Sequence, residues 1–282
     1  MSASIMYGKV LADKIREEIK TDVQELVQHQ IKPKLSVLII GDNPASKTYV
    51  RMKQKACEKV GIESDVIKLQ SDVSEDELLK QIELLNNDRS VHGILVQLPL
   101  PEHVNEKRVL EYIDPNKDVD GFHPINVGRL SIDQDALVPC TPLGIVALLD
   151  YYNVSIEGKH AVVIGRSNIV GKPVGQLLLN RQATVTYCHS KTQNLKEITK
   201  TADILIVAVG RAELINEEYV KEGAVVVDVG NTFLETGKVV GDVAFDQVKD
   251  IASQITPVPK GVGPMTITML LNNTIKAAKY SM

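Results

Sequence analysis

The sequence has few cysteines, no long apolar run and no excess of positive charge, and each deficit excludes a class of protein. Cys57, Cys140 and Cys188 are far apart, odd in number and without a CxxC pair, so neither a disulfide framework nor a zinc site is indicated. The N-terminus lacks an apolar run of signal-peptide length, and no later run approaches the roughly 18 apolar residues that span a bilayer. We therefore expect a soluble, cytoplasmic protein.

The formal net charge of -4 gives no electrostatic reason to expect nucleic acid as a partner, so a small-molecule ligand is favoured. With 44% hydrophobic and 24% charged residues, the composition is that of an ordinary globular protein. The length of 282 residues allows two domains, each with its own core.

The first half of the chain alternates helical and strand patterns. Apolar residues recur at helical spacing over residues 10–27, and a second helix is expected around residues 49–60. A third helix begins at Ser74, with Glu77 completing a capping box. Continuous apolar runs, typical of a parallel sheet covered by helices on both faces, mark the strands KLSVLIIG and HGILVQLPL, and ESDVIKL lies between them. This order predicts an N-terminal α/β domain.

The regular pattern lapses between about residues 114 and 143, where we expect a cleft between two lobes. A second alternation then predicts a Rossmann-type domain, with strands at KHAVVIG, TVTYCH, ADILIVAVG and AVVVDVG. The last segment is predicted to be a helix with Pro264 in its first turn, returning to the first lobe. We thus predict an α/β fold with one domain of residues 1–121 and 264–282 and another of residues 122–263.

The run VVIGRSNIVGKPVG follows a predicted strand and opens a helix, which is the context of a phosphate-binding turn. Its glycines are Gly165, Gly171 and Gly175, and Ser167 stands where the dinucleotide fingerprint GxGxxG has its second glycine. Because of this departure, a merely structural glycine-rich turn remains an alternative.

The end of the next strand bears on the choice of cofactor. NAD-binding folds usually place an acidic residue there to hold the ribose 2′-hydroxyl, and TVTYCHSKT has none. Ser190 can instead hydrogen-bond a 2′-phosphate, and Arg166, His189 or Lys191 can supply positive charge. This pattern favours NADP over NAD, the alternative being an ordinary solvated strand end.

Tyr49 and Lys53 lie four residues apart on a predicted helix and therefore project from one face. Desolvation in a cleft can lower the pKa of a lysine amine until it serves as an acid or base near neutral pH. Taken alone, the pair also fits a solvated helix face that carries one aromatic residue.

Three further positions are candidates for a ligand site. Gln97 stands at the end of a predicted buried strand, where α/β folds place ligand-facing groups, although it could equally satisfy backbone groups beside Pro99. The loop KDVDG presents Asp118 and Asp120, which could accept hydrogen bonds from a ligand or simply form a turn. The segment TPVPKGVGPMT combines stiff and permissive backbone that could approach a ligand closely.

Together these segments resemble the bifunctional methylenetetrahydrofolate dehydrogenase/methenyltetrahydrofolate cyclohydrolase family over nearly the whole chain. The segments that carry the resemblance, all in the family's order, are YVRMK, VHGILVQLPLP, KDVDGFHPINVGRL, PCTP, GRSNIVGKP, CHSKT, VVGDVAF and TPVPKGVGPMT. The resemblance implies that Lys53 is central to the cyclohydrolase step, that Tyr49 places the substrate and that Gln97 holds the lysine. It also implies that Asp120 grips the pterin ring.

Further contacts are implied by the resemblance alone. The NADP contacts would be Gly165, Arg166, Ser167, Ser190 and Asn231, and the remaining folate contacts would be Leu98, Pro99, Pro259, Gly261 and Val262. Lys260 departs from the family, because it replaces the first glycine of the usual PGGVGPMT. This departure puts the backbone contact of that segment in doubt, and the lysine could instead meet the acidic tail of the folate.

The resemblance implies oxidation of methylenetetrahydrofolate with NADP, then hydrolysis of the methenyl product to 10-formyltetrahydrofolate, by a homodimer joined through its cofactor lobe. Such an enzyme serves one-carbon metabolism and thereby purine, histidine and methionine biosynthesis. No metal is expected. Two alternatives are a dehydrogenase that has lost the hydrolytic step and a catalytically silent binding protein.

Overall fold

A computed structural model describes residues 2–281 of the chain. The chain divides into two compact units, which we name after their main sheets. The three-strand unit comprises residues 14–140 and 267–282, and the six-strand unit comprises residues 141–266 and those up to residue 13. The divisions fall within the helices α1 (Gly8–Gln28) and α10 (Val262–Lys279), so each helix contributes to both units.

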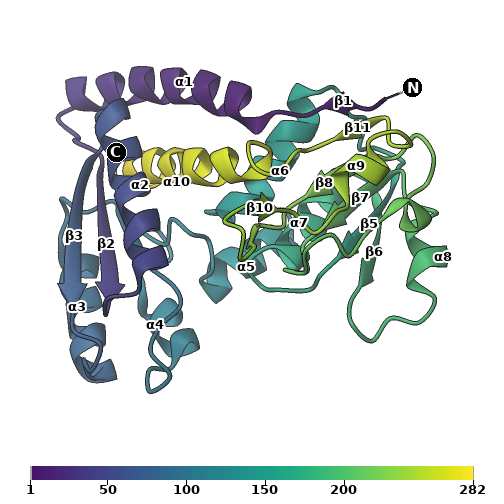
Figure 1. Cartoon of the computed structure of the whole chain (residues 1–282). Coiled ribbons are helices and arrows are strands. Elements are labelled where there is room, and N and C mark those ends of the chain that lie inside the picture. Colours follow the sequence, from purple (N-terminus) through teal and green to yellow (C-terminus); the bar gives the residue numbers. More distant parts are fainter. Residues whose placement is uncertain (1, 282) are drawn as a thin grey trace. The chain divides into compact units, whose positions relative to one another are not determined.

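The sheet of the three-strand unit has β2 (Lys34–Ile40) at its centre, between β3 (Glu63–Leu69) and β4 (Gly93–Val96). All pairings are parallel, and β2 and β3 lie side by side in Figure 1. Almost every residue of β2 and β4 is buried, which explains their continuous apolar sequences. The helices of this unit after α1 are α2 (Pro44–Val60), α3 (Glu75–Asn87), α4 (Glu106–Tyr112) and α5 (Pro124–Ser131).

Local chemistry fixes where the early helices begin and end. The Asn43 side chain accepts hydrogen bonds from two backbone N–H groups in the first turn of α2, and Gly61 ends that helix with a φ of 85°. The predicted capping box of Ser74 and Glu77 is present at the start of α3.

The six strands of the second sheet all pair in parallel, in the order β1-β11-β8-β7-β5-β6. The neighbours of β5 (His160–Ile164) are β6 (Thr184–Cys188), which follows it in sequence through α7 (Gly171–Asn180), and β7 (Ile204–Val207). The strand order therefore reverses at β5, where doubly wound sheets bind their ligands. The other elements are β1 (Ser4–Ile5), α6 (Cys140–Tyr151), α8 (Leu195–Thr199), a 3₁₀ turn (Glu217–Tyr219), β8 (Val225–Asp228), β9 (Thr232–Phe233), β10 (Val239–Val240), α9 (Phe245–Val248) and β11 (Gln254–Ile255).

The α/β class with a Rossmann-type sheet is confirmed, but the expected lapse of regular structure between residues 114 and 143 is wrong in part. The helix α5 and the start of α6 lie in this stretch. At the start of α5 the imidazole of His123 accepts a hydrogen bond from the Ile125 N–H, so an unusual capping residue concealed the helix. In α6 the apolar residues surround the helix instead of following one face, and the helical period is lost.

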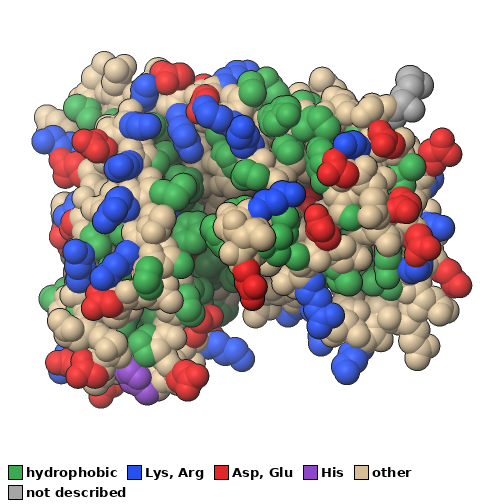
Figure 2. All heavy atoms as spheres, in the orientation of Figure 1, with side chains coloured by type: hydrophobic (Ala, Val, Ile, Leu, Met, Phe, Trp, Pro, Cys, Tyr) green, Lys and Arg blue, Asp and Glu red, His purple; other side chains and the backbone are tan. Residues whose placement is uncertain are grey.

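The C-terminal helix α10 joins the three-strand unit from residue 267 onward. The Lys276 ammonium donates to the carbonyl of Ala136 at 2.8 Å, and the Tyr280 hydroxyl donates to the Asp135 carboxylate at 2.7 Å. No helix within residues 2–281 is long and apolar enough to cross a membrane. On the face shown in Figure 2, Lys and Arg side chains are mixed with Asp and Glu.

Candidate active site

The centre of the candidate site in the three-strand unit is a hydrogen bond between Lys53 and Gln97. The Lys53 Nζ on α2 donates to the Gln97 Oε1 at 3.0 Å, 44 positions along the chain. Gln97 directly follows β4, and its Nε2 donates to the Leu98 carbonyl at 2.8 Å, which turns the amide oxygen toward the lysine. The partly buried amine is therefore held at the carboxyl end of a parallel sheet.

The KDVDG loop runs beside β4 and places Asp120 in the same region. The backbone N–H of Ile94 in β4 donates to the Lys117 carbonyl at 2.8 Å, and Asp118 forms a parallel bridge with Ile94. Gly121 has a φ of 73°, and a Cβ there would lie 2.5 Å from the Pro139 nitrogen. Only glycine fits this turn, so the backbone conformation next to Asp120 is fixed.

The two acids of this loop have different surroundings. The buried Asp118 carboxylate accepts hydrogen bonds from the His123 N–H at 2.8 Å and the Asn126 amide at 3.0 Å, so its role is to hold the loop. The Asp120 carboxylate accepts a long contact from the thiol of Cys140, at 3.9 Å. The pKa of Asp120 is raised, mainly by burial and to a smaller extent by the charge of Asp118, whereas the charge of Lys53 acts in the opposite direction. Asp120 thus retains acceptor capacity for a ligand, next to the lysine charge.

Asn273 on α10 supports this loop and was missed in the sequence. Its buried amide donates to the carbonyls of Val119 and Val138, both at 2.8 Å, and contacts the Cys140 Sγ at 3.7 Å. These bonds tie the residue before Asp120 to the C-terminal helix. An Asn pair within an otherwise apolar helix, LLNNTIKAA, is the signal that could have identified it, because buried amides require partners.

The other predicted residues of the three-strand unit lie close in sequence to this centre. Tyr49 stands one helical turn before Lys53 on α2, and 38% of its surface is exposed. Leu98 and Pro99 follow Gln97 and are joined by a cis peptide bond.

In the six-strand unit, two of the three predicted glycines permit a close approach of backbone at the end of β5, and the third packs α7 against β6. A Cβ on Gly165, whose φ is 124°, would lie 2.2 Å from the Ala208 carbonyl oxygen. A Cβ on Gly171 would lie 2.3 Å from the Gly165 oxygen, and one on Gly175 would lie 2.2 Å from the Tyr187 hydroxyl. The turn therefore requires glycine at Gly165 and Gly171, as a dinucleotide-binding turn does, whereas a side chain at Gly175 would have to displace the Tyr187 ring.

Ser167 binds the backbone at the start of α7 and stands in place of a further glycine. Its hydroxyl accepts hydrogen bonds from the N–H groups of Val170 at 3.2 Å and Gly171 at 3.3 Å. Arg166 and Ser190 are exposed after β5 and β6, and Asn231 is exposed after β8. Since the strands are parallel, all these positions lie along the carboxyl edge of one sheet.

The segment before α10 explains the family's glycine at position 260. Lys260 has a φ of 85°, a left-handed conformation that costs a side-chain-bearing residue about 1 kcal/mol. Its carbonyl accepts a hydrogen bond from the Gly8 N–H at 2.9 Å, which holds the conformation in place. A Cβ on the neighbouring Gly261 would lie 2.4 Å from the Pro257 oxygen. Pro259 follows a cis peptide bond, and Val262 begins α10.

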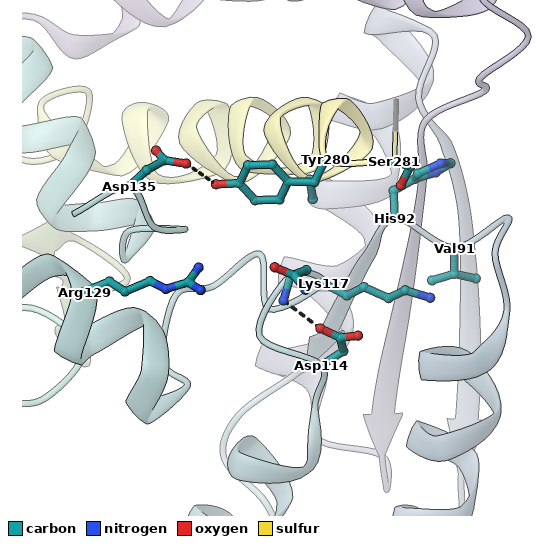
Figure 3. A pocket seen from close by; sticks show the side chains of 10 residues that line it. Val91, His92, Asp114, Lys117, Arg129, Asp135, Tyr280 and Ser281 are labelled. Atoms are coloured by element: carbon teal, nitrogen blue, oxygen red, sulfur yellow. Dashed lines mark hydrogen bonds between the residues drawn. The ribbon is translucent and has the colours of Figure 1, made fainter.

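A separate cavity of about 530 Å³ lies at the opposite, amino end of β4 (Figure 3). The polar side chains that line it are largely engaged in hydrogen bonds with neighbouring protein groups. The Lys117 ammonium donates to the carbonyls of Leu85, Asn86 and Asp88 at 2.7–2.9 Å, and Asp135 accepts from Tyr280. We therefore read this cavity as the junction of α3, α5 and α10 and not as the reaction site.

The glycine turn at the switch point of a parallel sheet, with a lysine–amide pair at the edge of a second sheet, defines an α/β enzyme that binds a dinucleotide. Two family models match this chain: the tetrahydrofolate dehydrogenase/cyclohydrolase catalytic domain at residues 6–120 and the corresponding NAD(P)-binding domain at residues 139–282. The chain belongs to the tetrahydrofolate dehydrogenase/cyclohydrolase family.

Individual relatives agree with this assignment. The chain is 60% identical to the bifunctional protein FolD of Bacillus anthracis, with 99% of this chain and 98% of that protein covered. It matches the crystal structure of the FolD dehydrogenase/cyclohydrolase from Campylobacter jejuni at 53% identity and a TM-score of 0.98, with both chains fully covered. The Trypanosoma brucei enzyme, solved with NADP and an inhibitor, matches at 39% identity and a TM-score of 0.95 over 100% of this chain and 99% of that one.

The chain is accordingly a bifunctional enzyme of methylenetetrahydrofolate oxidation and methenyltetrahydrofolate hydrolysis. The predictions of the family, the enzyme class and the NADP cofactor are confirmed by these relatives.

Proposed function

We propose that Lys53, Gln97, Asp120 and Tyr49 perform the folate chemistry of this enzyme. The observation that carries the proposal is the 3.0 Å hydrogen bond from the Lys53 Nζ to the Gln97 Oε1. Gln97 fixes the position of the amine, Asp120 binds the pterin amide and amine groups, and Tyr49 orients the ring from the same helix as the lysine. The roles of Leu98, Pro99, Pro259, Gly261 and Val262 as folate contacts stay predictions.

In the proposed reaction, NADP held at the glycine turn would supply the hydride acceptor for oxidation of the methylene carbon, and the folate would then carry a methenyl cation. A water molecule then adds to this carbon and loses a proton, which the Lys53 amine accepts directly or through a second water. The bond from the carbon to N5 breaks as the remaining hydroxyl proton passes to N5, which leaves the formyl group on N10. Lys53 thus acts only in the hydrolytic half of the sequence.

For the cofactor, we propose contacts from Gly165, Arg166, Ser167, Ser190 and Asn231. The fit rests on the cradle at Gly165, where a side chain would collide with the Ala208 carbonyl, and on the exposed Ser190 at the end of β6. The absence of an acid at this strand end leaves the position open to a 2′-phosphate.

We propose that the three-strand unit is the catalytic domain for folate and that the six-strand unit is the cofactor domain. Three free, buried cysteines fit a protein of the reducing cytoplasm. In that compartment the enzyme would supply formyl groups for purine synthesis and serve histidine and methionine synthesis.

We also propose that the enzyme is a homodimer joined through the cofactor domain. The support is the hairpin of β9 and β10, where Phe233 is 69% exposed and the adjacent Leu234 is 37% exposed. An exposed apolar pair on a two-stranded ribbon is costly in water and suits a second copy of the same ribbon.

Phe233→Asp should therefore convert the dimer to a monomer. Placing a carboxylate in an apolar contact costs several kcal/mol and lowers the association constant by about a hundredfold or more. Light scattering after size exclusion would measure the mass. The matched control is Ile132→Asp, which changes an equally apolar residue that is 65% exposed on the three-strand unit. A monomeric wild-type protein would contradict the proposal.

One assay tests the proposed function as a whole. The enzyme receives methylenetetrahydrofolate and NADP, and we expect both NADPH and 10-formyltetrahydrofolate to form. NADPH without the formyl product would leave a dehydrogenase alone, and no NADPH would leave a binding protein.

A further inference from the structure

Two buried carboxylates at the carboxyl edge of the six-stranded sheet are absent from the chemistry described above. Asp228 ends β8, and Asp242 follows β10 in the segment VVGDVAF. Their exposed fractions are 3% and 0%. Burying charge at this depth is costly unless it is compensated by hydrogen bonds, so the partners of the two acids indicate what they do.

The Asp242 carboxylate binds the backbone of the loop that follows β7. Its Oδ2 accepts hydrogen bonds from the N–H groups of Val209 at 2.7 Å and Gly210 at 2.9 Å, and its Oδ1 accepts one from Arg211 at 2.8 Å. Three successive N–H groups therefore converge on one carboxylate. Ala208, the residue before them, is the one whose carbonyl oxygen would lie 2.2 Å from a Cβ on Gly165.

Asp228 binds the backbone of both the loop that follows β8 and the segment that follows β10. Its Oδ1 accepts from the N–H groups of Gly230 and Asp242, both at 2.9 Å, and its Oδ2 accepts from Val243 at 3.0 Å. Gly230 precedes Asn231, the proposed cofactor contact. The pKa of Asp228 is raised to about 7, because the effects of burial and of the Asp242 charge outweigh the lowering by its backbone hydrogen bonds.

The approach of the two segments depends on small residues. A Cβ on Gly241 would lie 1.8 Å from the Asp228 Oδ2, and one on Gly230 would lie 2.3 Å from the Asp242 nitrogen. The carboxylates and glycines thus form one interlocked unit.

We propose that Asp242 and Asp228 are positioning residues for NADP, which hold the loops after β7 and β8 in the shape that receives the cofactor. The inference rests on the proposed placement of NADP along this edge. Neither side chain needs to touch the cofactor, because each acts through the backbone that it binds.

Asp242→Asn tests the proposal with little change in size. In either orientation of the amide, its NH₂ group faces at least one backbone N–H, which loses its acceptor. We expect the KM for NADP to rise by roughly tenfold or more. The hydrolysis of supplied methenyltetrahydrofolate, which consumes no NADP, should stay within about twofold of the wild-type rate. Hydrogen exchange should accelerate in a peptide covering residues 208–214 and stay unchanged in one covering β5.

Asp246→Asn is the matched control, since it removes an exposed carboxylate four residues further along and should change none of these values. If Asp242→Asn does not fold, the same measurements are made on Asp228→Asn. This is a milder change, because its amide oxygen can keep the two hydrogen bonds that Oδ1 accepts and only the bond from Val243 is lost. An unchanged KM for NADP with unchanged exchange would overturn the proposal. Failure of the wild-type enzyme to bind NADP would instead refute the placement of the cofactor.

Discussion

Replacing Lys53 with methionine should abolish the hydrolysis of methenyltetrahydrofolate and leave much of the NADP-dependent oxidation intact. Methionine preserves the length and the apolar part of the side chain but cannot accept the proton that the attacking water releases. Loss of a general base costs on the order of 10²–10⁴ in rate. Hydride transfer depends mainly on alignment of the two ligands, so it should fall far less. Absorbance would follow NADPH and the methenyl compound separately.

The control for this variant is Lys55→Met on the same helix. Lys55 is exposed, whereas the partly buried Lys53 donates to Gln97. The same chemical change should leave both activities at the wild-type level. Hydrolysis retained by Lys53→Met would overturn the role of this residue. Equal loss of both activities would show that the amine serves only to build the site.

The fold was predictable where the sequence carries a short-range pattern. The apolar runs of β2, β4 and β7 and the capping box of Ser74 and Glu77 were all identified correctly. The strands β1 and β11 have two residues each and exist because β1 pairs with β11, some 250 positions away, and β11 pairs in turn with β8. Nothing local marks such strands, because their stability comes from the sheet that they join.

The site was predictable only as a set of residues. Lys53 and Gln97 are each unremarkable alone, and their hydrogen bond exists because α2 and the end of β4 meet at the same sheet edge. The family resemblance supplied this pairing, which no spacing rule contains. Asn273 and Asp242 were missed for the same reason, since their partners lie 135–154 and 31–33 positions away.

Ser190→Asp should reverse much of the preference for NADP over NAD. Ser190 lies just beyond the end of β6, the strand that follows the glycine turn, where NAD-binding folds carry an acid. A carboxylate there repels the 2′-phosphate of NADP and accepts a hydrogen bond from the 2′-hydroxyl of NAD. Both effects act in the same direction, so the ratio of kcat/KM for the two cofactors should shift by about 10²-fold.

Ser190→Asn separates charge from size, because it adds nearly the same bulk without the negative charge and should shift the ratio much less. In the surrounding turn, the Lys191 N–H donates a hydrogen bond to His189 Nδ1 at 3.2 Å. Arg166 and Lys191 are exposed and remain as partners for the phosphate. Hydrolysis of supplied methenyltetrahydrofolate without NADP should proceed at the wild-type rate in both variants. An unchanged cofactor preference in Ser190→Asp would place the 2′-phosphate elsewhere. A shifted preference with unchanged hydrolysis would show that the cofactor preference is set in the six-strand unit and the proton transfer in the three-strand unit. Each property could then be changed without the other.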